Sequence, residues 1–180
     1  MEEGDDLIVF SPQSVSFPLN KILTVLVDAG IPASMSVSAA GEADEADLLS
    51  REWDAVFIRW TEPELHDVLL LTRDNTDVDE DAAAILNAAL DLTKAFEGAD
   101  RLLVEDHLRR THSLYSVEFL PALLADEEHP AWDALDLLLA AIADASEGMV
   151  YAKGEGFFDD VLNPILAFES EDDEFPEETE

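Results

Sequence analysis

Hydrophobic residues recur along the chain with two different periods. Short apolar runs and alternations of apolar with polar residues predict strands, at residues 7–10, 33–38, 55–60, 68–71, 113–120 and 149–152. Apolar residues three and four positions apart predict helices, from Pro18 to before Gly30, from a capping box at Asp77 and Glu80 to before Gly98, and from Pro130 to before Gly148. The turn-rich residues 61–64 join two of the strands as a hairpin.

Three further segments have weaker patterns. Residues 42–52 predict a loop or a short solvated helix, and residues 101–112 predict either a short helix or a direct lead into the strand at 113. Residues 161–168 predict a helical turn that packs on the core through Leu162, Ile165 and Phe168.

This order of elements predicts an α+β fold. The expected sheet is mixed but mainly antiparallel, with helices packed on one face, because a hairpin pairs some strands and helical crossovers join the others. A duplicated ferredoxin-like half is one possible topology, and a three-layer α/β sheet is the alternative.

The expected organisation is one domain with two acidic ends. Residues 1–6 form an acidic N-terminal extension, residues 7–168 a single globular α+β domain, and residues 169–180 a disordered acidic tail, too poor in apolar residues to offset the entropy of ordering. The chain has no cysteine, no apolar run long enough to cross a bilayer and no basic start typical of a secretory signal. These features favour a soluble cytoplasmic protein that contacts no membrane.

The charge is extreme, with 43 Asp and Glu against nine Lys and Arg and a formal net charge of −34. Without the four acids of residues 1–6 and the eight of residues 169–180, 31 acids remain, so the central region is itself acidic. Such a body repels itself in dilute buffer, whereas about 1 M salt shortens the Debye length to about 3 Å. The composition resembles that of cytosolic proteins from halophilic archaea. The alternative is a carboxylate surface that imitates DNA, and direct nucleic-acid binding is not expected.

No recognisable motif carries catalytic chemistry. Gly154-Glu155-Gly156 lacks the Lys and Ser/Thr of a phosphate-binding loop and predicts a turn with positive φ. The four histidines have no zinc-site spacing, and no GxSxG sequence is present. We therefore expect no cofactor and no metal, and the balance favours a protein that is not an enzyme.

The densest basic cluster is the one candidate ligand site. It comprises Arg101, His107, Arg109 and Arg110 in a chain with only six arginines. An anionic metabolite is the ligand that such a cluster would bind. The simpler interpretation is that these arginines are counter-ions of neighbouring acids such as Glu105 and Asp106.

The opening strand, helix and strand, followed by the sequence from Trp53 to Arg59, resemble the N-terminal domains of some ATP-grasp ligases. The resemblance covers under a third of the chain. The phosphate-binding loop and metal carboxylates of those ligases have no counterpart here, so it implies no site residues.

Three functions remain open on these grounds. The first is a non-enzymatic interaction or accessory protein of a salt-adapted organism, with an unidentified protein partner and a possible homodimer. The second is a protein or enzyme that holds an anionic metabolite at Arg109 and Arg110. The third is an acidic DNA mimic that inhibits a nucleic-acid enzyme.

The charge generates the first prediction. The melting temperature should rise steeply between dilute buffer and several molar potassium chloride, because salt screens the repulsion between surface carboxylates. Calorimetry across that salt range measures it. A melting temperature that does not change with salt would contradict salt adaptation as the origin of the acidity.

Overall fold

The computed structural model describes residues 7–37, 41–62 and 66–168, and the expected acidic ends at 1–6 and 169–180 lie outside them. The described strands are β1 (Leu7–Ser11), β2 (Ala33–Ser36), β3 (Ala55–Trp60), β4 (His66–Asn75), β5 (Ser113–Phe119), β6 (Met149–Ala152), β7 (Gly156–Phe158) and β8 (Pro164–Ala167). The described helices are α1 (Asn20–Asp28), α2 (Glu45–Leu49), α3 (Glu80–Thr93), α4 (Ala99–Arg109), α5 (Pro121–Leu124) and α6 (Leu135–Ser146).

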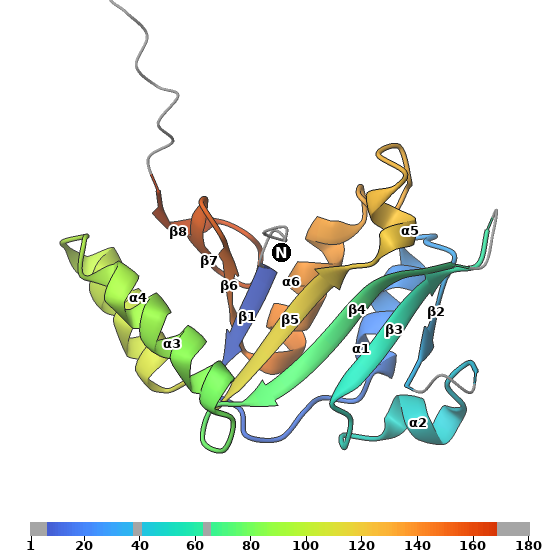
Figure 1. The fold of residues 1–180 in the computed structure, drawn as a ribbon, viewed down its shortest axis with the longest axis horizontal. Coiled ribbons are helices and arrows are strands. Elements are labelled where there is room, and N and C mark those ends of the chain that lie inside the picture. The colour runs from blue at the N-terminus through green and yellow to red at the C-terminus, as the bar shows by residue number, and fades with distance from the viewer. Residues whose placement is uncertain (1–6, 38–40, 63–65, 169–180) are drawn as a thin grey trace, which may run out of the picture.

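All eight strands form one open sheet in the order β2-β3-β4-β5-β1-β6-β7-β8 (Figure 1). Every neighbouring pair is antiparallel. The α+β class and the antiparallel character of the sheet are thus confirmed. The expected parallel crossovers do not occur among the described strands, because three strands separate β1 from β2. The ferredoxin-like duplication is not confirmed.

The central strand β1 contributes side chains to both faces of the sheet. Val9 belongs to one apolar cluster, and Ile8 and Phe10 belong to the other. This alternation follows from the two-residue period of a strand. Because β5 and β6 also pair with β1, both clusters meet at the middle of the sheet.

Helices cover the two faces unequally. We call the face that carries Val9 the first face, and α1 and α6 pack on it and on each other. We call the opposite face, which carries Ile8 and Phe10, the second face, and the α3–α4 hairpin packs on it through Ala82, Ala89, Val104 and Leu108. The structure therefore differs from the expectation that helices lie on one face, because the apolar stripes of α3 and α4 bury a second set of strand residues.

The ends of the helices follow local chemistry. Asp79, and not Asp77, caps α3, since its carboxylate accepts hydrogen bonds from the backbone N–H groups of Asp81 and Ala82 at 2.9 Å each. Glu147 ends α6 in a left-handed conformation with φ of 53°. The ambiguous residues 101–112 are helical up to Arg109, so the helical alternative is correct for α4.

The C-terminal strands differ from the prediction. The helical turn expected at 161–168 is wrong, because Pro164–Ala167 forms β8, and β7 before it was not predicted. The turn at Gly154 and Gly156 is confirmed, with φ values of 82° and 137°. At Gly156 the backbone also approaches β8 closely, and an added Cβ would lie 2.1 Å from the carbonyl oxygen of Leu166.

These two glycines provide a matched test of the last hairpin. Gly154→Ala meets no neighbouring atom and should destabilise the protein by about 1 kcal/mol through its positive φ alone. Gly156→Ala adds a clash with the backbone and should cost about 3 kcal/mol. Chemical denaturation in molar salt measures both values, and equal losses would contradict the close pairing of β7 with β8.

Candidate functional site

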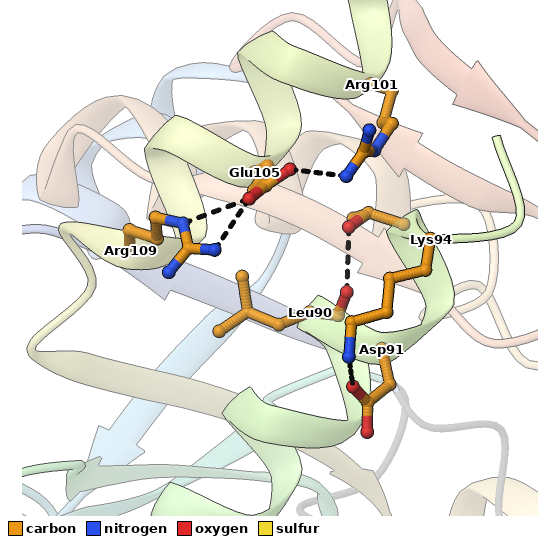
Figure 2. Close-up of polar contacts among 7 residues, drawn as sticks. Leu90, Asp91, Lys94, Arg101, Glu105 and Arg109 are labelled. Atoms are coloured by element: carbon orange, nitrogen blue, oxygen red, sulfur yellow. Dashed lines mark hydrogen bonds and ion pairs between the residues drawn. The ribbon is translucent and has the colours of Figure 1, made fainter. Parts of the chain in front are cut away.

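The predicted basic cluster lies on α4, which runs antiparallel to α3 on the second face. Arg101, Glu105 and Arg109 are four residues apart, so successive turns of the helix place them on one side. That side faces α3, where Lys94 and Asp91 form an ion pair of 2.5 Å between Nζ and Oδ1 (Figure 2).

Glu105 stands between the two arginines. Its Oε2 accepts a hydrogen bond from Arg101 Nη2 at 2.9 Å, and its Oε1 accepts from Arg109 Nη2 at 2.7 Å and from Arg109 Nε at 3.1 Å (Figure 2). The hydrogen bond from Arg109, and after it the positive charges of Arg101, Arg109 and Lys94, hold the pKa of Glu105 below its ordinary value. The carboxylate is therefore charged at neutral pH and neutralises part of the cluster.

A polar cleft between the two helices has a volume of about 350 Å³. Three of its lining residues are cationic and two are anionic, in a chain with a strong excess of acids. The lining is Asn87, Leu90, Asp91, Thr93, Lys94, Arg101, Glu105 and Arg109. The cleft is thus the place where the structure gathers positive charge.

Two members of the predicted cluster lie outside this cleft. His107 is half-buried, and its Nε2 donates a hydrogen bond of 2.8 Å to the backbone carbonyl of Phe10. Burial holds the pKa of His107 below 6.5, its ordinary value, so the imidazole is neutral at pH 7. Arg110 pairs with Asp106 at 3.0 Å and is exposed.

This geometry favours the counter-ion interpretation. Arg101, Arg109 and Arg110 each pair with a carboxylate of the same helix. An anionic ligand would have to displace Glu105 from both of its arginines. The Nε atom of Arg101 is buried and has no hydrogen-bond partner among the described residues, which leaves one donor in the cleft unused.

Two apolar surfaces were not predicted. One is a groove on the first face beside Trp132, and the other is the part of the second face that the α3–α4 hairpin leaves uncovered. Both are assembled from segments far apart in the chain. The only local signal was the aromatic residues themselves, such as Phe57, Phe119 and Trp132.

The described part of the chain has no group of three or more His, Asp or Glu side chains placed to hold a metal ion. It also has no helix that is both long and apolar enough to span a bilayer. Arg59 of β3 pairs with Asp67 of β4, and its side chain is half-buried, with 19% exposed.

Comparisons with known proteins provide no relative: no family model, no curated protein and no solved structure matches the chain. The resemblance to ATP-grasp ligases therefore gains no support.

The buried histidine generates a prediction about pH. As the pH falls through about 6.5, an unfolded His107 takes up a proton that the folded protein resists, so stability should fall with the pH. His107→Gln keeps a donor for the carbonyl of Phe10 and removes the titration. Between pH 7.5 and 5.5 in molar potassium chloride, the variant should therefore lose less stability than the wild type. The limiting difference is about 1.4 kcal/mol per pH unit.

His112→Gln is the control, because His112 lies at the surface in contact with Asp77. This control should retain most of the wild-type pH dependence. Identical slopes for wild type and His107→Gln would show that the buried imidazole is not coupled to folding.

Proposed function

We propose that the chain is a non-enzymatic interaction protein of a salt-adapted, cytoplasmic environment, and that it binds a partner protein through the uncovered part of the second face. The observation that carries the proposal is the partial covering of this face. No helix of the described chain lies over β3, β4 and β5, which face the viewer in Figure 1, whereas α1 and α6 lie behind them.

The uncovered strands present a mixed, partly apolar surface. The register places Phe57 of β3 opposite Leu70 of β4, and Ser116 of β5 opposite Thr72 in the next row. All four side chains are half-buried. They point to the same side as Ile8, which pairs with Ser116, so they belong to the second face.

The apolar side of α3 extends this surface. Ile85, Ala88 and Leu92 are three and four residues apart and exposed, with Ile85 at 39% and Leu92 at 40%. Helical spacing places them about a third of a turn around α3 from Asn87, Asp91 and Lys94, which line the cleft toward α4. Since α3 contacts β4 and α4 contacts β8, the side of α3 away from α4 is the side of β4.

The margin of this surface is acidic, which indicates the chemistry of the partner. Burial, and next the charges of Asp79 and Asp54, raises the pKa of Asp74, at the end of the same row of β4. Glu118 is exposed beside Leu70. A partner with an apolar centre and Lys or Arg around it would relieve this repulsion. A second copy of this chain would add to it.

Two other functions remain proposals with less support. The anionic-metabolite site would need Glu105 to leave the arginines that it now pairs with. The DNA mimic requires carboxylates in rows at phosphate spacing. The uncovered surface instead combines apolar residues with acids at its edge, which is the arrangement of a protein interface.

The test of this interaction uses substitutions on α3, because its exposed side chains can be replaced with the least effect on the fold. The double variant Ile85→Glu with Leu92→Glu should weaken binding of the partner about 100-fold, because two charges would be buried where the apolar side of α3 extends the contact. The partner is first captured from an extract of the encoding organism in about 2 M potassium chloride. It is then purified, and binding is measured by calorimetry with the two pure proteins.

The matched control is Leu102→Glu with Leu103→Glu on α4, where the side chains are 59% and 55% exposed but lie away from the uncovered strands. This control should bind like wild type. Equal loss in both double variants would contradict the proposed surface. If light scattering shows a wild-type dimer that the α3 double variant abolishes, the partner would instead be a second copy of this chain.

A further inference from the structure

The apolar groove on the first face lies at the other side of the sheet from the proposed protein interface. Its volume is about 420 Å³, within the range of small-molecule sites of about 300–1,000 Å³. Nine of its twelve lining residues are apolar: Leu7, Phe119, Trp132, Leu135, Leu139, Val150, Ala152, Phe158 and Leu162. The strands β1, β5, β6 and β7 provide the floor, and α6 provides one wall.

The aromatic side of the groove is held in place by packing and hydrogen bonding. Trp132 packs edge-on against Phe119, with ring centroids 5.0 Å apart. Its indole Nε1–H donates a hydrogen bond of 2.9 Å to the carbonyl of Asp126. The ring is therefore oriented without a ligand, and its remaining surface borders the groove.

The opposite wall includes a strained residue. Leu162 has φ of 61°, a left-handed conformation that costs a non-glycine residue about 1–2 kcal/mol. The loop is fixed by Asp159, whose Oδ1 accepts hydrogen bonds from the backbone N–H groups of Val161 at 3.0 Å and Asn163 at 2.8 Å. Leu162 therefore keeps an apolar side chain beside the groove, although a glycine at this position would remove the backbone strain.

The polar residues of the lining are Asp136, Lys153 and Glu155. Asp136 and Glu155 are exposed, and their carboxylates have no hydrogen bond or ion pair within the described chain. Lys153 has an interaction within the protein. The unpaired polar groups of the lining are therefore both acids, and the net charge of −34 also repels anions.

We infer that this groove binds a small hydrophobic molecule that carries one cationic ammonium group. The apolar body lies between Trp132 and Leu162, and the ammonium lies near Asp136 and Glu155. Charge complementarity selects the cation, and the aromatic rings of the lining add a favourable surface for it.

Three matched probes test the inference: 3-phenylpropylammonium, 3-phenylpropan-1-ol and 3-phenylpropanoate, which share one apolar body and differ in charge. They are titrated into the full-length protein at about 1 M potassium chloride, where only contacts within about 3 Å escape screening. The readout is the nuclear magnetic resonance signal of the Trp132 indole. The buried Trp53 and Trp60 act as internal references.

The ammonium probe should bind with a dissociation constant on the order of 1 mM. It should bind about threefold tighter than the alcohol and about tenfold tighter than the carboxylate, because two exposed carboxylates each contribute modestly. Absence of a shift at Trp132 with every probe, or equal binding of ammonium and carboxylate, would overturn the inference.

Two variants locate the effect. Asp136→Asn with Glu155→Gln should bind all three probes within about twofold of one another, whereas the exposed Asp144→Asn on the same helix should keep the wild-type order. Leu162→Gly relieves the left-handed strain and should retain the fold, but should weaken all three probes about tenfold by removing one wall. Unchanged selectivity in the first variant or unchanged affinity in the second would overturn the inference.

Discussion

The rest of the structure depends on β1, which is buried on both faces of the sheet and paired with a neighbouring strand at both edges. Val9 is fully buried in the core of the first face, and Ile8 and Phe10 are buried in that of the second. A shift of one residue in its pairing would exchange these sets, so the two cores together fix the register more strongly than either would alone. The surrounding features also depend on β1: His107 bonds to the carbonyl of Phe10, and Leu7 forms part of the floor of the groove.

The second constraint is the place where the chain inserts its helical hairpin. The strands β4 and β5 are neighbours in the sheet, but α3 and α4 lie between them in sequence. The hairpin returns over β1 and β8 rather than over β4 and β3, since its apolar residues join Ile8, Phe157 and Leu166. One part of the second face is therefore covered and the other is not. The polar cleft and the uncovered surface both follow from this asymmetry, one on each side of α3.

The sequence predicted what is local and failed where contacts are distant. Helical spacing correctly identified the stripe of α1, and four-residue spacing explains why Arg101, Glu105 and Arg109 meet. The strands β7 and β8 were missed because they have three and four residues, with Gly156 and Pro164 at their starts. Sheet order was beyond prediction, since β1 pairs with strands more than 100 residues away. The apolar groove draws on four strands, one helix and the turns and loops beside them, so no spacing in the sequence could reveal it.

The charge and the two apolar surfaces are parts of one physical arrangement. In molar salt the Debye length is about 3 Å, so attraction survives only between groups already in contact, such as Arg109 and Glu105 at 2.7 Å. Long-range steering then contributes little to recognition, and hydrophobic burial, which excluded salts strengthen, has to supply most of the affinity. If the two proposed surfaces bind their ligands under that condition, carboxylates at the margin would exclude anionic groups, and the apolar centre would supply most of the free energy of binding. The uncovered strands beside α3 and the groove beside Trp132 both have an apolar middle with acids at the edge, and in the groove Lys153 stands beside those acids.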